Sequence, residues 1–184
     1  MPVTVERGIH HVAYACRDLE ATNHFYEELM GFELVHTEVN EVAGGFFRHV
    51  FYDTGAGGML AFFDVHGVGE REGWSSAISR GNGLPVWVNH IAFAADKATM
   101  EAARARFDVA GIEPLMEVDH GWCHSLYYED PNGIMVEFCR DTPGFERDAE
   151  GARSKLRELP QVRQRAAAAA AVVTDAEVAG TVPD

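Results

Sequence analysis

One carboxylate stands in an otherwise apolar, strand-like stretch, and it is the first side chain in this sequence that could do chemistry. The turn-forming residues 131–133 (Pro-Asn-Gly) lead into residues 134–138 (Ile-Met-Val-Glu-Phe), whose Ile, Val and Phe favour a half-buried strand. Because side chains two residues apart share a strand face, Glu137 points away from Val136 and Phe138. An ionised carboxylate on a buried strand must be paired or bound to a metal. Glu137 is therefore a candidate metal ligand.

Two histidines at equivalent places in an internal repeat supply partners for this carboxylate. The segment HVAYA begins at His11, and the similar segment HIAFA begins at His90. Two imidazoles and one carboxylate on rigid strands form the 2-His-1-carboxylate triad, which leaves open positions on an octahedral metal ion. His10 is the rival to His11, but the repeat places Asn89 opposite His10. His11, His90 and Glu137 are therefore the predicted ligands of one divalent metal ion.

The elements that must position these ligands follow the order βαβββ twice. Asp18 is a suitable N-cap for the first helix, and Gly31 and Gly111 are suitable residues to end the two helices. The expected elements of the first half are strand 8–16, helix 19–30 and strands 32–39, 46–53 and 59–65. Those of the second half are strand 88–94, helix 97–110 and strands 113–118, 123–129 and 134–139.

The spacing of matched residues supports the repeat. From the repeated histidine to the helix-ending glycine there are 20 residues in the first half (31 − 11) and 21 in the second (111 − 90). Further along, Gly58 pairs with Gly133, and this alignment matches His49 with His124. Units this short cannot each bury their own sheet. We therefore predict an α+β fold in which two paired βαβββ modules share one core.

The expected domain spans residues 1–141. It consists of module one (about 8–65), a linker rich in Gly and Ser (66–87) and module two (about 88–141). Residues 142–184 become charged and then alanine-rich, and we expect a partly helical or disordered tail there. A helix of this tail that packs on a second subunit is the alternative.

Charge and cysteine content indicate which classes of binding partner are excluded and which cellular compartment is expected. The formal net charge of −14 opposes binding to nucleic acid or to an anionic membrane, because both require a basic surface. The first residues lack the pattern of a signal peptide, and no apolar run approaches the roughly 20 residues that span a bilayer. Cys16, Cys123 and Cys139 are odd in number and lack CxxC spacing, so we expect reduced thiols in a cytoplasmic protein.

Three motifs together resemble a known superfamily. HVAxxxxDLE with FYEELMGF, then NHIAF, then DPNGIMVEF are similar to the vicinal oxygen chelate superfamily, which includes glyoxalase I, bleomycin resistance proteins, fosfomycin-resistance proteins, methylmalonyl-CoA epimerase and type I extradiol dioxygenases. The resemblance covers about residues 8–141. It implies a glyoxalase/dioxygenase-like domain, and it carries the metal ligands of the family onto His11, His90 and Glu137.

The same resemblance implies that one ligand of the glyoxalase I branch is missing. Members of that branch have a glutamate where the repeat, counted from its paired glycines, gives this chain Phe62. Asp64 lies two residues further on and could substitute, although a solvated aspartate at a strand end is the simpler interpretation. Three ligands instead of four favour a dioxygenase-like or fosfomycin-transferase-like member.

The resemblance also implies catalytic residues near Glu137. Extradiol enzymes of this superfamily have a tyrosine ten residues before the ligating glutamate, and Tyr127 has that spacing here (137 − 127 = 10). They also have an active-site histidine shortly before the tyrosine, for which His120 and His124 are the candidates. His120 is closer to the spacing of the family, and His124 is the candidate for the same strand face as Tyr127. Proton donors and acceptors of these types suit the deprotonation of a catechol.

These expectations combine into one preferred function and two alternatives. The preferred function is an extradiol-type dioxygenase that cleaves a catecholic ring with O2. Its cofactor would be a divalent metal, with Fe(II) first and Mn, Zn, Ni or Co as alternatives, since histidine and carboxylate suit all of them. The alternatives are a glyoxalase-like lyase, isomerase or epimerase, and a non-catalytic module that binds a drug. We expect a small-molecule substrate, an aromatic vicinal diol, and a homodimer, with neither nucleic acid nor membrane as a partner.

Overall fold

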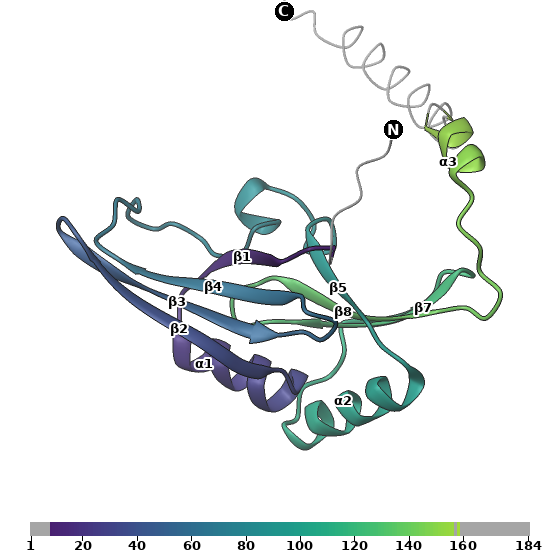
Figure 1. Cartoon of the computed structure of the whole chain (residues 1–184), viewed down its shortest axis with the longest axis horizontal. Coiled ribbons are helices and arrows are strands. Elements are labelled where there is room, and N and C mark those ends of the chain that lie inside the picture. Colours follow the sequence, from purple (N-terminus) through teal and green to yellow (C-terminus); the bar gives the residue numbers. More distant parts are fainter. Residues whose placement is uncertain (1–7, 157, 159–184) are drawn as a thin grey trace, which may run out of the picture. The chain divides into compact units, whose positions relative to one another are not determined.

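The fold consists of two βαβββ modules, seen in a computed structural model that describes residues 8–156 and 158 (Figure 1). Module one contains β1 (His11–Cys16), α1 (Leu19–Asn23), the π-helical segment η1 (His24–Met30), β2 (Glu33–Val42), β3 (Gly45–Asp53) and β4 (Met59–His66). Module two contains β5 (His90–Ala94), α2 (Lys97–Val109), β6 (Met116–Asp119), β7 (Cys123–Glu129) and β8 (Met135–Asp141). A short 3-10 helix, η2 (Arg80–Asn82), lies in the linker.

Each module forms its own four-stranded mixed sheet. The strand orders are β1-β4-β3-β2 and β5-β8-β7-β6, so the two sheets have the same topology. In both sheets the first strand of the module pairs in parallel with its last strand, and the other pairings are antiparallel. The predicted α+β fold of two paired βαβββ modules is confirmed.

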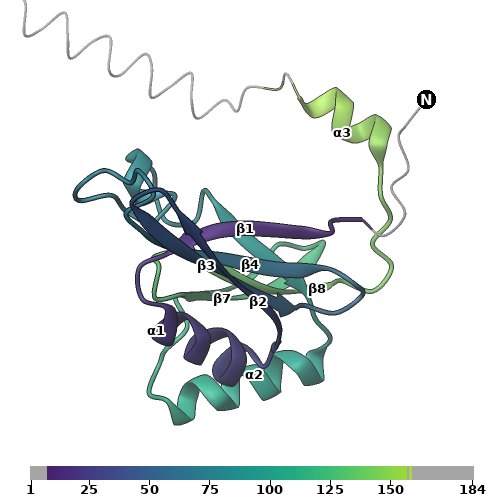
Figure 2. The same cartoon turned by 60° about the vertical axis from the view of Figure 1, so that its left-hand side comes forward.

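Both helices cover the same side of the two sheets, as the two views in Figures 1 and 2 agree. Helix-facing residues of both modules belong to one hydrophobic cluster. Across the module boundary the ring centroids of Phe25 and Phe107 are 5.4 Å apart, and those of Phe32 and Phe93 are 4.8 Å apart. The shared core therefore lies on the helix side. We call the opposite side of each sheet its open face.

The first helix differs from its prediction in one respect. The expected helix 19–30 is α-helical only to Asn23 and then continues as η1. Its ends are as predicted: the Asp18 side chain accepts a hydrogen bond from the backbone N–H of Ala21 at 2.9 Å, and Gly31 has a φ of 82°. Arg106 of α2 donates hydrogen bonds to the carbonyls of Leu29 and Met30, at 2.7 and 2.9 Å. These bonds tie α2 to the end of η1.

A buried polar turn between β7 and β8 ties the modules together a second time. The Asp130 carboxylate accepts hydrogen bonds from the backbone N–H groups of Asn132 and Ile134, at 2.9 and 2.8 Å. It also accepts one from the hydroxyl of Tyr26 in η1, at 2.9 Å. Burial raises the pKa of Asp130, while these hydrogen bonds act in the opposite direction.

Asn132 continues this connection toward module one. Its side-chain amide donates to the hydroxyl of Thr22 at 3.1 Å, and its side-chain oxygen accepts from the backbone N–H of Arg17 at 3.1 Å. Asn132 and Asp130 are 2% and 4% exposed. Because polar groups this deeply buried must be hydrogen-bonded, the turn holds the first helix of module one at a defined place on module two.

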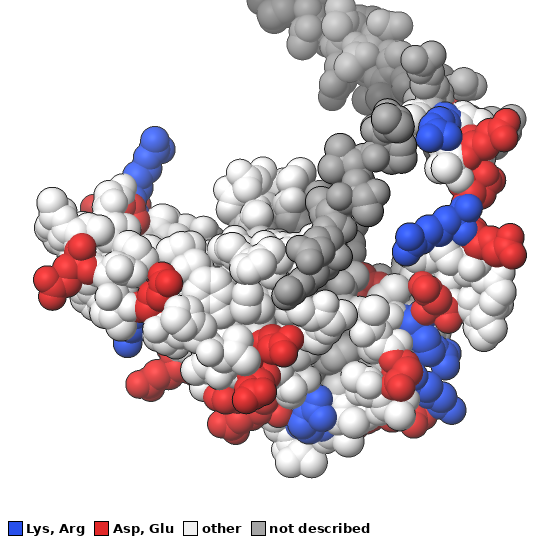
Figure 3. Space-filling view, viewed as in Figure 1, with Lys and Arg blue, Asp and Glu red and all other residues white. Residues whose placement is uncertain are grey.

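Charge is unevenly distributed on the surface. Around α1 in Figure 3 the coloured side chains are mainly acidic, and Glu20, Glu27 and Glu28 of the α1–η1 helix are exposed. In the described part of the chain, no helix is long and apolar enough to cross a membrane.

The chain divides into two compact units, and the first ends at Pro143. In the second unit the described residues include α3 (Ala149–Lys155), whose N-cap Asp148 accepts a hydrogen bond from Gly151 at 2.8 Å. Most of the predicted tail, including its alanine-rich stretch, lies outside the described residues.

The buried turn generates a stability prediction based on two tyrosines. Tyr26 and Tyr128 are both 0% exposed, but the Tyr128 hydroxyl has no hydrogen-bond partner among the described residues, whereas that of Tyr26 binds Asp130. Tyr26→Phe should lower the free energy of unfolding by about 1.5–3 kcal/mol, since it removes a hydrogen bond to a buried carboxylate. Tyr128→Phe is the matched control and should leave it unchanged or raise it, as measured by urea denaturation. Equal losses in the two variants would contradict this role of the turn.

Candidate metal and acid–base site

Polar side chains of module two gather on the open face of its sheet. Strand alternation separates them from the core: Leu126 and Tyr128 of β7 and Phe138 of β8 point to the helix side, where they belong to the hydrophobic cluster. The side chains on the open face come from three adjacent strands. They are His90 of β5, Glu137 and Cys139 of β8, and Cys123, Ser125 and Tyr127 of β7.

Glu137 is a buried carboxylate with no cationic Lys or Arg partner among the described residues. It is 4% exposed. Its Oε2 lies 3.1 Å from Nε2 of His90, and its Oε1 accepts a hydrogen bond from the Ser125 hydroxyl at 2.5 Å. Removal of a carboxylate from water is costly unless a cation or several hydrogen bonds compensate. This environment fits a metal ligand.

His90 is oriented as a metal ligand would be. Its Nδ1 lies 2.8 Å from the carbonyl oxygen of Trp87, while its Nε2 faces Glu137. Both ring nitrogens therefore face acceptors, although a neutral imidazole carries one N–H. A cation between Nε2 and Glu137, either a proton or a metal ion, satisfies both. Hydrogen bonding of Nδ1 to a backbone carbonyl is also the usual outer contact of a metal-bound histidine.

Tyr127 and His120 form a hydrogen-bonded pair beside this carboxylate. Tyr127 is directly opposite Glu137 in the β7–β8 pairing, and its hydroxyl lies 3.0 Å from Nε2 of His120, in the turn that follows β6. The rings of Tyr127 and His90 meet edge to face at 6.2 Å. Burial is the largest cause that raises the pKa of Tyr127. Tyr127 is therefore a protonated phenol placed between the candidate ligands and a histidine.

His124 does not join this group. It points to the other side of β7, where its Nε2 lies 2.8 Å from Glu117, and Glu117 also binds Arg104. The expectation that His124 shares the strand face of Tyr127 is wrong, because residues three apart on a strand point to opposite faces. Of the two candidate histidines, the structure brings His120 to Tyr127.

His11 lies in module one, apart from His90 and Glu137. Its Nδ1 is 2.8 Å from Nδ1 of His10, and its ring contacts those of Phe51 and His49, with centroids 5.6 and 6.3 Å away. Among the described residues, the group of three potential ligands with donor atoms within 4.8 Å of one another does not include His11. One chain thus brings together two of the three predicted ligands.

The pairing of strands corrects the alignment of the two modules. His11 pairs with Met59 and His90 with Met135, so two positions further on Ala61 is the counterpart of Glu137. The predicted counterpart, Phe62, is wrong by one residue. The reason is that module two has one residue more between its turn glycine and the strand, and a shift of one moves every side chain to the other face. A carboxylate is absent from the fourth-ligand position in either alignment.

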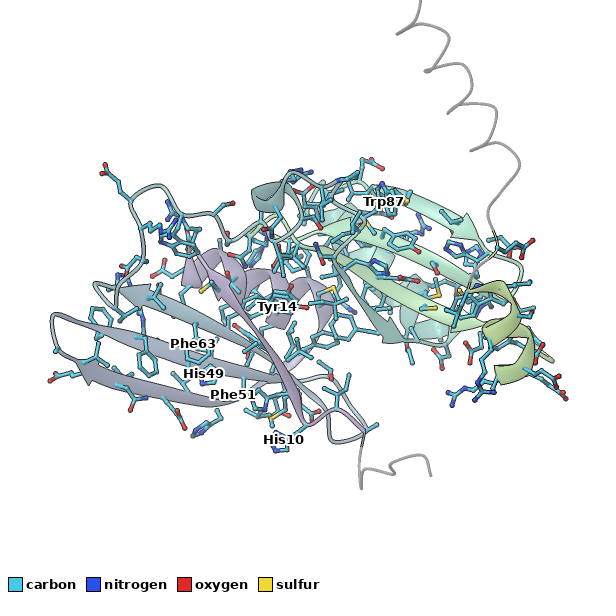
Figure 4. The ribbon with its side chains drawn as sticks, turned by 90° about the horizontal axis from the view of Figure 1, so that it is seen from above. His10, Tyr14, His49, Phe51, Phe63 and Trp87 are labelled. Atoms are coloured by element: carbon cyan, nitrogen blue, oxygen red, sulfur yellow. The ribbon has the colours of Figure 1, made fainter. Side chains whose placement is uncertain are left out.

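Aromatic side chains occupy the open face of module one. By the corrected pairing, Phe51 is the counterpart of Tyr127, His49 of Ser125 rather than of His124, and Phe63 of Cys139. Figure 4 shows His49 between Phe63 and Phe51 on the sheet. The rings of His49 and Phe63 stack at 3.7 Å, burial lowers the pKa of His49, and its Nε2 has no hydrogen-bond partner among the described residues. We call His11, His49, Phe51 and Phe63 the aromatic face.

Asp64 is neither a substitute ligand nor a solvated strand end. It is 4% exposed, and its Oδ2 accepts hydrogen bonds from Nε of Arg48 at 2.7 Å and from Nε2 of His66 at 2.9 Å. Asp64 alternates with Phe63 along β4, so it points away from the aromatic face. The ion pair with Arg48 accounts for its burial.

Two thiols, for which the sequence predicts only the ordinary reduced state, lie next to Glu137. All three cysteines are free, but Cys123 and Cys139 lie with Glu137 as the group of three whose donor atoms are within 4.8 Å. Burial, followed by the Cys123 thiol, raises the pKa of Cys139 to about 12. The period-two pattern from Cys123 to Tyr127 and from Glu137 to Cys139 was the signal in the sequence that could have identified Cys123, Ser125 and Cys139 as neighbours of the carboxylate.

Solved structures with the same fold include proteins of several activities. A glyoxylase/bleomycin resistance protein/dioxygenase domain from Frankia sp. EAN1pec is 17% identical, with a TM-score of 0.57 over 77% of this chain and 96% of that one. A lactoylglutathione lyase from Agrobacterium tumefaciens is 26% identical, with a TM-score of 0.50 over 74% and 96%. A variant of the fosfomycin resistance protein FosX from Listeria monocytogenes, complexed with Mn(II) and 1S,2S-dihydroxypropylphosphonic acid, is 19% identical, with a TM-score of 0.52 over 76% and 96%.

A family model covers the same region as the two modules. The model described as the Glyoxalase/Bleomycin resistance protein/Dioxygenase superfamily matches residues 8–138, which include the predicted ligands His11, His90 and Glu137. This match confirms the resemblance that the motifs indicated. Because it spans both modules and most of the chain, the chain belongs to the Glyoxalase/Bleomycin resistance protein/Dioxygenase superfamily.

Proposed function

We propose that this protein is a divalent-metal-dependent enzyme that acts on a small molecule at the open face of module two. The observation that carries the proposal is the pair formed by His90 and Glu137, 3.1 Å apart. The carboxylate is buried without a Lys or Arg partner among the described residues, and a backbone carbonyl fixes the imidazole. Such a pair meets the requirements of two ligands of one metal ion.

His90 and Glu137 would hold the metal from one chain, and we infer that His11 comes from a second copy. His11 belongs to the aromatic face of module one, away from the carboxylate of its own chain. In a symmetric dimer, the open face of module one in one copy can meet the open face of module two in the other, twice. Each site would then combine a metal-binding wall with an aromatic wall.

The finer proposal is an extradiol-type dioxygenase that cleaves a catecholic ring with O2. When bound, Fe(II) or a similar ion would supply coordination of two vicinal oxygens and activation of O2. The hydroxyl of Tyr127 and Nε2 of His120, 3.0 Å apart, can pass a proton between the substrate oxygen and the solvent-facing imidazole. Phe51 and Phe63, which both contact the ring of His49, offer apolar contacts suited to an aromatic ring. Ala61 leaves no fourth carboxylate ligand.

A glyoxalase-like lyase or isomerase is the second candidate. The similarity to the lactoylglutathione lyase favours this candidate. The sequence identity to that protein is 26%, whereas it is 17% and 19% for the other two proteins described above. Such an enzyme would use the metal as a Lewis acid and needs a base near the substrate carbon. The Tyr127–His120 pair is the candidate for that base in this chain.

The first test is metal content combined with O2 consumption. After anaerobic purification we expect about one Fe(II) or Mn(II) per chain, and O2 uptake with a yellow ring-cleavage product on a panel of catechols. His90→Ala and Glu137→Gln should lose both metal and activity, since each removes a ligand. Zinc, nickel or cobalt without O2 uptake would favour the lyase or isomerase. Absence of metal, with unchanged ligand binding in both variants, would leave a non-catalytic binding module.

Mixing two inactive variants tests whether the site is shared between copies. His11→Ala and Glu137→Gln should each be inactive, but a mixture refolded together should regain about a quarter of the wild-type activity, because half of the dimers are mixed and each has one intact site. His90→Ala mixed with Glu137→Gln is the control for nonspecific recovery: both ligands come from the same chain, so no mixed dimer has an intact site and no activity should return. Failure of the first mixture to exceed the sum of its separate components would place all three ligands in one chain.

The proton-transfer role predicts coupled losses at Tyr127 and His120. Tyr127→Phe and His120→Ala should each lower kcat by about 10²–10⁴-fold, and the double variant should lose little more than one of them, because the two residues act as a unit. Metal content should remain that of the wild type. His124→Ala, on the opposite strand face, is the matched control and should keep kcat. Full activity of Tyr127→Phe would remove this residue from the mechanism.

A further inference from the structure

Two thiols and a carboxylate converge on the open face of module two, beside the proposed imidazole–carboxylate pair. Sγ of Cys123, Sγ of Cys139 and a carboxylate oxygen of Glu137 all lie within 4.8 Å of one another. The Ser125 hydroxyl is their common neighbour: it lies 2.5 Å from Glu137 Oε1, 3.6 Å from Cys123 Sγ and 3.8 Å from Cys139 Sγ.

Strand geometry makes this convergence a fixed feature of the fold. Ser125 pairs directly with Cys139, and Glu137 precedes Cys139 by two residues on the same face of β8. Cys123 precedes Ser125 by two residues on β7, which places the two thiols diagonally across the strand pair. Because all three donors stand on paired strands, little conformational freedom would be lost when an ion binds them.

The dimensions match a soft divalent ion. In tetrahedral zinc sites the Zn–S distance is about 2.3 Å, so two sulfur ligands lie about 3.8 Å apart. Donor atoms already within 4.8 Å need to move by only about 1 Å to reach that geometry. Thiolate and carboxylate together suit zinc and other thiophilic ions, whereas they do not suit magnesium or calcium.

The group also has an approach from solvent. Cys123 is 1% exposed, but Cys139 is only partly buried. Cys139 lines a cavity of about 620 Å³ together with Ala92 and Ala94 of β5 and with Asp141. Small alanine side chains leave the thiol reachable from this cavity.

We propose that Cys123, Glu137 and Cys139 form a second metal site, one for a thiophilic divalent ion such as Zn2+, next to the imidazole–carboxylate pair. The two thiols would each release a proton to solvent, and water would fill the fourth position. Glu137 serves both sites. A thiophilic ion that takes Glu137 therefore competes with the metal held by His90, and the protein would lose activity when zinc or cadmium is present in excess.

Cobalt absorption tests the site directly, independently of catalysis. The full-length protein, reduced and freed of metal, is titrated with Co2+ without O2, and sulfur-to-cobalt charge transfer in the near ultraviolet is followed. We expect one such band per chain in the wild type. We expect it also in the His11→Ala/His90→Ala variant, where the proposed enzymatic site is destroyed. Cys139→Ser should lower the Co2+ affinity, as measured by the growth of this band, about 100-fold or more, since one of three ligands is lost.

The third cysteine supplies the control. Cys16 is buried in the core cluster on the helix side, so Cys16→Ser should keep the band. Cys123→Ser is the second ligand variant, and circular dichroism distinguishes loss of the site from loss of the fold. No band in the wild type, or equal titration curves for the wild type and a folded Cys139→Ser, would overturn the proposal. A band in a protein without enzymatic activity would support the thiol site and reject only the proposed function.

Discussion

The buried turn at Asp130–Gly133 is the interaction on which the rest of the structure depends. Its carboxylate and amide are almost inaccessible, yet each hydrogen-bonds to backbone or side-chain groups of its own turn and of module one. Gly133 has a φ of 75°, a conformation that favours glycine, and the backbone then returns as β8. The turn therefore sets the register of β7 against β8. That register places Tyr127 opposite Glu137 and Ser125 opposite Cys139.

The two modules share a fold but not a surface chemistry. Their sheets have the same strand order and the same parallel first pair, and their helix sides merge into one core. On the open faces, equivalent positions differ: Glu137 corresponds to Ala61, Tyr127 to Phe51 and Ser125 to His49. Core positions must remain apolar in both modules, because both helices pack on them. Open-face positions carry no such requirement, so one sheet could specialise in polar chemistry and the other in aromatic contact.

Glu137 lies at the centre of the polar groups on the open face of module two. One of its oxygens faces an imidazole, and the other faces a hydroxyl surrounded by two thiols. Imidazole and carboxylate accept many divalent ions, whereas thiolates select soft ones. The metal selectivity of the proposed sites would therefore depend on which neighbours of this carboxylate an ion engages. Selection by ligand type is how proteins commonly discriminate among metals of similar affinity.

The sequence alone determined the fold and identified His90 and Glu137 as candidate metal ligands. Strand alternation, turn residues and the repeated HVAYA and HIAFA segments indicated two βαβββ modules, because these patterns depend on local geometry. The helix caps Asp18 and Gly31 were predictable for the same reason. The parallel pairing of β5 with β8, which the sequence analysis did not specify, is what brings His90 beside Glu137.

Only the tertiary structure decided what depends on register and on packing between segments distant in the sequence. One extra residue after Gly133 moved the counterpart of Glu137 from Phe62 to Ala61, and alternation placed His124 on the helix side while His120 reached Tyr127. A shift of one residue leaves hydrophobic patterns and motif spacing almost unchanged, yet it reverses every side chain. The separation of His11 from Glu137, and the convergence of two cysteines from different strands on that carboxylate, likewise depend on how the modules and strands pack in space rather than on local sequence.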